Sequence, residues 1–269
     1  MQQVITSAAN PVVKRVRLLA DRKHRRRQQA YVVEGLQPVW RAVSAGRQLE
    51  AVIVAPELLT NPAALEMVEE LAAAGVPVTR VSADIFRRLS DRDGPAGLAA
   101  IVRGGLGDLD ELVVTDDSVF VVLHEPRNPG NIGTIIRTAD AAGATGVILL
   151  GHTADPLSAA AIKASMGSLF GLPVVAVAEP AELLDWVGAN GVRLVAMSGG
   201  GTAELWSAEF GRPLAILLGN EGAGLPDTML AAAQQSVRIP MGGTAESLNV
   251  AAAAAVVLYE LKRRTSCDG

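Results

Sequence analysis

Residues 239–250 read IPMGGTAESLNV and connect a predicted strand to an alanine-rich helix. The short apolar run Ser236–Ile239 predicts the end of the strand. Pro240 then stops sheet pairing, because proline has no N–H group to donate. Gly242 and Gly243 allow the backbone to turn tightly or to approach a ligand closely. The stretch is therefore a strand–loop–helix junction whose loop suits a binding site.

Three polar side chains stand at the predicted start of this helix, which extends to about Arg264: they are Glu246, Ser247 and Asn249. A helix N-terminus carries free N–H groups and the positive end of the helix dipole, so polar or anionic groups are well placed there. The structural alternative is an ordinary N-cap formed by Thr244 or Ser247. Both interpretations stay open on this segment alone.

The rest of the chain repeats the order of strand and helix, which predicts an α/β fold. In the first half, strands are predicted at Tyr31–Val33, Leu49–Ala55, Val76–Val81 and Leu98–Val102, and helices at Leu36–Ala45, Asn61–Ala74 and Ala83–Leu89. The second half has near-continuous apolar runs, as expected for parallel strands buried on both faces. These strands are predicted at Val119–Leu123, Val147–Leu150, Val174–Ala178, Leu194–Met197 and Leu214–Leu218, and helices at Ile132–Ala142, Ser158–Leu169, Ala181–Ala189 and Pro226–Gln234.

The chain divides in the sequence at a glycine-rich segment that begins at Gly104 and is followed by acidic residues up to Asp117. Such a segment is typical of a linker. We therefore expect a small α/β domain at residues 1–103, a linker at 104–117, and a larger parallel-sheet domain at 118–269.

Length and composition indicate a soluble cytoplasmic protein. The longest apolar run, Val250–Tyr259, is half of the roughly 20 residues that a membrane span needs. No apolar segment follows the basic N-terminal residues, so no signal peptide is expected. The single cysteine, Cys267, can form no internal disulfide, which fits an intracellular location.

A basic N-terminal segment contrasts with an acidic remainder. Residues 1–47 contain ten Lys and Arg and two acidic residues, which gives this segment a net charge of +8. Because the whole chain has a net charge of −4, the remaining residues carry −12. The run RKHRRR at residues 22–27 ends or follows a helix that opens at Pro11. We predict phosphate contacts by Lys23, Arg25, Arg26 and Arg27, because Lys and Arg release condensed counterions from nucleic acid. A solvated surface is the alternative.

Three segments that carry candidate chemistry each follow the end of a predicted strand, where open α/β sheets bind ligands. They are HEPRNPGNIGTIIRT at residues 124–138, LGNEGAGL at 218–225, and the stretch at 239–250. The chain has no P-loop, its glycines do not have dinucleotide-binding spacing, and its histidines form no metal-ligand cluster with Cys267.

Together and in this order, the three segments resemble the motifs of the SpoU (TrmH-type) 2′-O-ribose RNA methyltransferases of the SPOUT superfamily. NIGTIIRT at residues 131–138 resembles the first motif, LLGNEGAGL from Leu217 the second, and IPMGGTAESLNVA from Ile239 the third. The resemblance covers about Val119 to Lys262. The first domain resembles the L30e-like substrate-binding domain of this family, through SAANP at residues 7–11, the basic helix, and YVVEG at 31–35.

This resemblance implies S-adenosylmethionine as the methyl donor, a deep trefoil knot, and a homodimer with the active site at the subunit interface. It implies a catalytic set of Asn131, Arg137, Glu221, Ser247 and Asn249. It implies that cofactor-binding positions are Met197, Leu218, Gly219, Ile239, Met241, Leu248 and Asn249. Arg137 lies six residues past Asn131, and we expect both to face one opening. No metal is required by the implied chemistry.

The substrate implied by the resemblance is RNA, with rRNA favoured over tRNA because the extra N-terminal domain is commoner in the ribosomal members. Alternatives are a tRNA 2′-O-methyltransferase, a ribosomal antibiotic-resistance methylase, and a non-catalytic RNA-binding protein. His124-Glu125 and Arg127-Asn128 depart from the family's usual residues before the first motif. These positions lie outside the implied catalytic set, so the departures bear on substrate fit.

Overall fold

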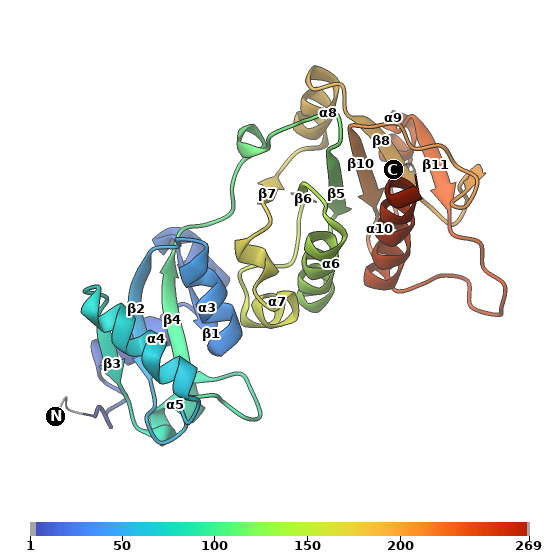
Figure 1. Cartoon of the computed structure of the whole chain (residues 1–269). Coiled ribbons are helices and arrows are strands. Elements are labelled where there is room, and N and C mark those ends of the chain that lie inside the picture. The colour runs from blue at the N-terminus through green and yellow to red at the C-terminus, as the bar shows by residue number, and fades with distance from the viewer. Residues whose placement is uncertain (1–3, 268–269) are drawn as a thin grey trace. The chain divides into compact units, whose positions relative to one another are not determined.

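The computed structural model describes residues 4–267 and divides into two compact units (Figure 1). Unit 1 runs to Gly105 and adds the segment Asp155–Gly171, which lies in the second half of the sequence. Unit 2 holds Leu106–Ala154 and the chain from Leu172 onward. Within residues 4–267, the structure contains no helix with the length and apolar content of a membrane span.

Unit 1 is built on a four-stranded mixed sheet with the order β1-β4-β2-β3. Its strands are β1 (Ala30–Glu34), β2 (Leu49–Val54), β3 (Val78–Arg80) and β4 (Leu98–Arg103), and its helices are α1 (Pro11–Leu18), α2 (Arg22–Gln28), α3 (Leu36–Ser44), α4 (Pro62–Ala73), α5 (Ala83–Leu89), α7 (Ala159–Ser165) and the short 3-10 helix η2 (Ser168–Phe170). Strand β4 pairs antiparallel with β1 and β2, and β2 pairs parallel with β3. Helices α1 and α5 pack together over the apolar sheet residues.

The segment Asp155–Gly171 is an integral part of unit 1. Helix α7 contacts β1, and the ring of Phe170 stacks on that of Tyr31 with the centroids 6.4 Å apart. Asp155 accepts hydrogen bonds from the guanidinium of Arg25. The second half of the chain therefore supplies one edge of the N-terminal fold.

Unit 2 is built on a seven-stranded sheet with the order β7-β6-β5-β10-β8-β11-β9, in which every pairing is parallel. Its strands are β5 (Val119–His124), β6 (Gly146–Leu150), β7 (Val174–Val177), β8 (Arg193–Met197), β9 (Ala203–Glu204), β10 (Leu214–Leu218) and β11 (Gln235–Arg238). Its helices are η1 (Leu109–Glu111), α6 (Pro129–Ala142), α8 (Pro180–Ala189), α9 (Asp227–Ala232) and α10 (Val250–Cys267).

Helices cover both faces of this sheet. On one face, Leu183 and Trp186 of α8 and Met229 of α9 pack against strand residues such as Phe120 and Ile148. Helices α6 and α10 pack side by side (Figure 1). They bury their own apolar residues together with the strand residues whose side chains point to the other face of the sheet, since side chains alternate along a strand. The predicted fold class, a parallel-sheet domain plus a smaller α/β domain, is confirmed; the trefoil knot stays a prediction.

The structure corrects one local expectation and adds two details. The expected helix Ser158–Leu169 breaks at Met166, whose φ of +50° ends α7 before η2 begins. The basic run forms a helix of its own, α2, because Asp21 caps it by accepting from the Lys23 N–H. Strand β9 was not expected, since two residues carry no alternation that a sequence pattern can reveal.

The start of α10 is capped by Asn249. Its Oδ1 accepts from the N–H of Ala251 at 2.9 Å, so the cap is neither Thr244 nor Ser247. This cap uses the Oδ1 atom of Asn249 and leaves its Nδ2 group available to donate a second hydrogen bond.

Candidate active site

The loop after β10 is a tight turn held by main-chain and side-chain bonds. The N–H and carbonyl of Asn220 pair with Gly224 at 3.0 and 2.9 Å. A Cβ atom on Gly219 would lie 2.4 Å from the Gly224 carbonyl carbon, so this position requires glycine. The Asn220 side chain accepts from the N–H of Gly222 and donates to the carbonyl of Glu125 at 2.7 Å. The loop after β10 is thereby tied to the loop after β5.

A chain of polar contacts joins all three motif segments. Asn131, in the first turn of α6, donates from Nδ2 to Oε1 of Glu221 at 3.0 Å. The main-chain N–H of Arg127 donates to Oε2 of Glu221 at 3.3 Å. Asn249 in turn donates to Oδ1 of Asn131 at 3.4 Å. Residues from positions 131, 221 and 249 therefore form one connected group, although about 118 residues separate the ends.

The Glu221 carboxylate is stabilised as an anion. Partial burial alone would raise its pKa, but the opposing hydrogen bonds prevail and lower the pKa from its ordinary value. The donors are the Asn131 side chain and the backbone N–H groups of Glu221, Arg127 and Asn128. A carboxylate that accepts several N–H bonds favours its charged form. Glu221 is therefore an acceptor that organises its neighbours, and it is unsuited to hold a proton at neutral pH.

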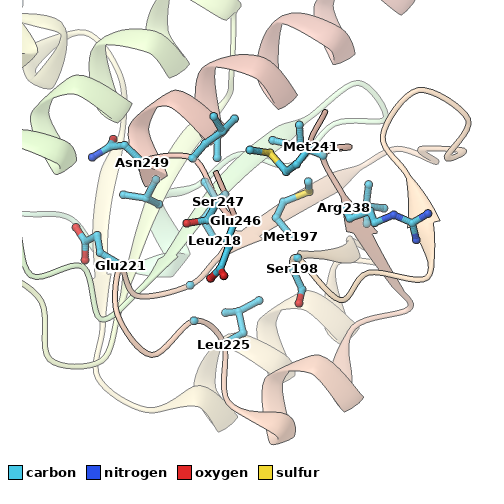
Figure 2. A pocket seen from close by; sticks show the side chains of 18 of the residues that line it. Met197, Ser198, Leu218, Glu221, Leu225, Arg238, Met241, Glu246, Ser247 and Asn249 are labelled. Atoms are coloured by element: carbon cyan, nitrogen blue, oxygen red, sulfur yellow. The ribbon is translucent and has the colours of Figure 1, made fainter. Parts of the chain in front are cut away.

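A cavity of about 880 Å³ lies beside this group, between the ends of β8, β10 and β11 and the start of α10. Figure 2 shows Glu221 and Asn249 on one side of the cavity and Met197, Ser198 and Arg238 on the other. Its wall combines apolar side chains with a few polar ones, as is common for sites that bind small molecules. The carboxyl ends of the parallel strands therefore position the site.

The structure brings most of the predicted site residues to this cavity. The residues of the prediction that line it are Met197, Leu218, Gly219, Glu221, Ile239, Met241, Ser247, Leu248 and Asn249. Asn131 reaches it through the Glu221 hydrogen bond. Arg137 is exposed on α6, and neither it nor Asn131 is among the lining residues, so the expectation that the two face one opening stays a prediction.

Sequence reasoning missed a second polar side of the cavity. Ser198, Glu204 and Arg238 also line it, and Arg238 pairs with Glu204 at 2.8 Å. Ser198 directly follows β8, and the strand-end rule could have identified it. Glu204 lies in the two-residue strand β9, and no periodic signal in the sequence indicates its position.

The four predicted RNA-binding residues on α2 differ in their surroundings. Lys23, Arg26 and Arg27 are exposed. Arg25 is buried, and its guanidinium donates to Asp155 and to the carbonyls of Leu19 and Ala20. The structure therefore corrects the set, because the donors of Arg25 are already used inside unit 1.

Comparisons with known proteins agree with this architecture. The model of the SpoU rRNA Methylase family matches residues 118–259, and that of the MRM3-like substrate binding domain matches residues 10–100. The 23S rRNA (uridine(2479)-2′-O)-methyltransferase of Streptomyces viridochromogenes is 34% identical, over 92% of this chain and 87% of the relative. The 23S rRNA (guanosine(2553)-2′-O)-methyltransferase of Bacillus subtilis is 31% identical, over 96% and 98% of the two chains.

A solved structure extends the likeness to three dimensions. The AdoMet-bound rRNA methyltransferase from Sinorhizobium meliloti aligns with a TM-score of 0.89 at 34% identity, and the alignment covers 97% of this chain and 98% of that one. The family match includes all three motif segments that the hydrogen bonds of Asn131, Glu221 and Asn249 join beside the cavity. On these grounds, the chain belongs to the SpoU rRNA methylase family.

Proposed function

We propose that this protein transfers a methyl group from S-adenosylmethionine to a ribose 2′-hydroxyl of 23S rRNA. The observation that carries the proposal is that hydrogen bonds join three distant motif segments, two of which line one cavity. Relatives whose names state this activity align with nearly the whole chain, including the N-terminal unit. A tRNA substrate and a resistance role for the same reaction are the alternatives.

The cavity suits the proposed cofactor. Gly219 and Gly224 both line it, and a Cβ atom on Gly219 would collide with the Gly224 backbone, so main-chain groups form the wall there. Leu218, Ile239 and Leu248 supply apolar surface that fits a flat purine ring. S-adenosylmethionine, when bound, supplies a methyl carbon already activated by the sulfonium charge.

The residues of the chain would chiefly align the ribose oxygen for attack. Alignment of reacting groups can lower a barrier by about 7–11 kcal/mol in favourable cases. We assign Asn131, Ser247 and Asn249 to orienting the ribose and the loop, and Glu221 to holding Asn131 in place. Hydrogen bonds already join Asn131, Glu221 and Asn249, and Ser247 lines the cavity beside them.

Arg137 would act on the hydroxyl that reacts. Its pKa, above ~12, makes arginine a poor general base. We therefore assign it to orienting the hydroxyl or an adjacent phosphate and to stabilising the developing alkoxide. The proton of the hydroxyl would leave to the substrate phosphate or to water.

We further propose a homodimer in which Arg137 acts in the active site of the partner copy. Arg137 is exposed on α6 and lies outside the cavity of its own chain. Among residues 4–267, no ion pair or hydrogen bond occupies its guanidinium. Tyr259, on the adjacent helix α10, is 51% exposed, which leaves an apolar surface for a second copy to cover.

The direct test compares methyl transfer and cofactor binding in Arg137→Ala. We expect radiolabelled methyl transfer to ribosomal RNA to be abolished, while the Kd for S-adenosylmethionine measured by calorimetry stays within a few-fold. Arg137→Lys is the matched variant that keeps the charge but loses the planar fork, and we expect it to be partly active. Transfer by Arg137→Ala near the wild-type rate would refute the assignment.

The RNA that is modified is identified by mapping ribose methylation across total RNA with and without the gene. Loss of one 23S rRNA methylation is the expected result, and loss of a tRNA methylation instead would favour the alternative. A wild-type protein that takes up no S-adenosylmethionine in calorimetry would support a non-catalytic RNA-binding protein. We place the reaction in the cytoplasm. We propose domain limits along the chain at 1–103 and 118–269, with the segment Asp155–Gly171 of the second domain packed into unit 1.

A further inference from the structure

Unit 1 exposes an aromatic side chain that its fold does not use. Trp40, on α3, is 48% exposed, although tryptophan is usually highly buried. The guanidinium carbon of Arg41 lies 5.5 Å from the centroid of the Trp40 ring. At this distance a cation is attracted to the face of an indole. Arg41 therefore steadies the ring while much of its surface remains open to solvent.

The same arginine contacts the segment that comes from the second half of the chain. A Cβ atom on Gly167 would lie 2.6 Å from Cγ of Arg41, so the two residues touch and Gly167 must be glycine. Met166, directly before it, has a φ of +50° and is 43% exposed. Trp40 directly precedes Arg41 in the sequence, and Met166 directly precedes Gly167. Each side of the Arg41–Gly167 contact therefore has an exposed apolar side chain as its sequence neighbour.

The two segments that meet at this contact carry cationic residues. Residues 36–49 and 156–171 together contain three charged residues, all cationic: Arg41, Arg47 and Lys163. All three side chains are exposed. An aromatic face among cations matches the two chemical parts of a nucleotide, because a base stacks on the ring and the flanking phosphates attract Lys and Arg.

We propose that Trp40 stacks on an unpaired base of the RNA substrate, with Met166 beside it and with Arg41, Arg47 and Lys163 near the flanking phosphates. The inference rests on the proposed function, and it specifies a substrate feature: a splayed nucleotide held by unit 1. We name this set of residues the Trp40 surface: Trp40, Arg41, Arg47, Lys163 and Met166. Because a base inside a duplex offers no free face for stacking, the Trp40 surface would select single-stranded RNA.

The test uses the full chain carrying Trp206→Phe, which leaves Trp40 and the buried Trp186 as fluorophores. The probes are a short single-stranded RNA and the same sequence as a duplex. We expect the single strand to quench Trp40 fluorescence. Trp40→Ala should bind the single strand roughly 5- to 150-fold more weakly, the range for loss of one base stack. Trp40→Phe should lose less, and duplex affinity should not change.

The matched control is Leu65→Ala, which removes an apolar side chain of similar exposure, 42%, from α4 of the same unit. Its RNA affinity should equal that of the parent. Unchanged single-strand affinity in Trp40→Ala would overturn the inference. Dissociation of a wild-type dimer by Trp40→Ala in sedimentation would also overturn it, because Trp40 would then contact a second copy.

Methyl transfer to ribosomal RNA separates this inference from the proposed function. If the parent protein methylates the RNA and Trp40→Ala does so with an unchanged KM, the stacking inference alone fails. If the parent methylates no RNA, the proposed function fails whatever the fluorescence shows. An increased KM with a retained kcat in Trp40→Ala is the result that supports both.

Discussion

At the scale of single residues, Glu221 is the acceptor that joins two motif segments. Its two carboxylate oxygens accept from the Asn131 side chain and from the Arg127 N–H. Glutamine has the same shape, but its amide nitrogen cannot accept a hydrogen bond. Replacing the carboxylate with an amide therefore removes acceptor capacity from one oxygen position while the rest of the loop is retained.

We predict that Glu221→Gln lowers kcat by up to ~100-fold, because small displacements of positioning groups cost rates of that order. Cofactor affinity should change little, since Glu221 acts on Asn131. Because the pKa of Glu221 is lowered, wild-type activity should persist somewhat below the ordinary carboxyl pKa as the pH falls. Methyl-transfer rates from pH 4 to 8 test this, with the exposed Glu209→Gln as control. Equal rates for Glu221→Gln and wild type would contradict the role.

At the scale of elements, the end of α10 holds the loop that follows β9. Arg264 donates to the carbonyls of Leu205 and Ala208 and lies over the ring of Phe210. Glu260, which is buried, accepts from Arg263 and Arg264. These hydrogen bonds lower the pKa of Glu260 to about 2. One carboxylate thus orients the arginine that anchors the loop.

The lowered pKa of Glu260 predicts a pH dependence of stability. A carboxyl with a lower pKa in the folded state stabilises the fold above its ordinary pKa, and that contribution disappears as the pH falls toward the folded value. We expect Glu260→Gln to have a lower Tm than wild type at pH 7, and the difference to vanish near pH 2. Thermal melts across this range test it, with Glu182→Gln on α8 as the control; a constant difference would contradict it.

Helix α2 contains two kinds of arginine that are indistinguishable in sequence. The side chains of Arg25 and Asp155 are 8% and 13% exposed, and their closest atoms are 2.6 Å apart. Breaking a buried pair typically costs 3–5 kcal/mol, because the remaining charge stays buried. We predict that Arg25→Met lowers the free energy of unfolding by about this amount, measured in urea, while Arg26→Ala changes it by less than ~0.5 kcal/mol. Similar values for both would contradict the buried pair.

The exposed residues of α2 should instead affect RNA binding. Replacing Lys23, Arg26 and Arg27 with alanine should reduce the slope of log K against log salt by roughly 0.7–0.9 for each phosphate that the variant no longer neutralises. Arg87→Ala and Arg88→Ala on α5 are controls that remove exposed cations elsewhere in unit 1. An unchanged slope in the α2 variant would favour a solvated surface that does not touch RNA.

At the scale of the whole molecule, the proposed dimer predicts that two inactive variants restore each other. In a mixed dimer of Arg137→Ala with Asn249→Ala, one active site would combine an intact loop with an intact Arg137 from the partner. Random mixing of subunits with two-fold symmetry then yields about a quarter of wild-type activity. We expect this recovery after the two purified variants are exchanged and assayed together. Activity no higher than that of either variant alone would place Arg137 in the site of its own chain.

Much of the fold could be predicted from the sequence because its signals are local. Strands buried on both faces are near-continuous apolar runs, and the expected limits of Leu214–Leu218 and Ala83–Leu89 are those observed. The glycines at 219 and 224 and the polar residues at 221, 247 and 249 likewise stand in short motifs with recognisable spacing. These features depend on neighbouring residues, and the sequence contains that information directly.

The packing of helices and strands in three dimensions determines which distant groups meet. It paired Arg25 with Asp155, 130 residues away, and so removed one cation from the predicted RNA surface. It joined Asn131 to Glu221 and Asn249, and it placed Arg137 outside the cavity of its own chain. A hydrogen bond or ion pair between sequence-distant side chains depends on how helices and strands pack, and no local pattern of residues encodes that geometry.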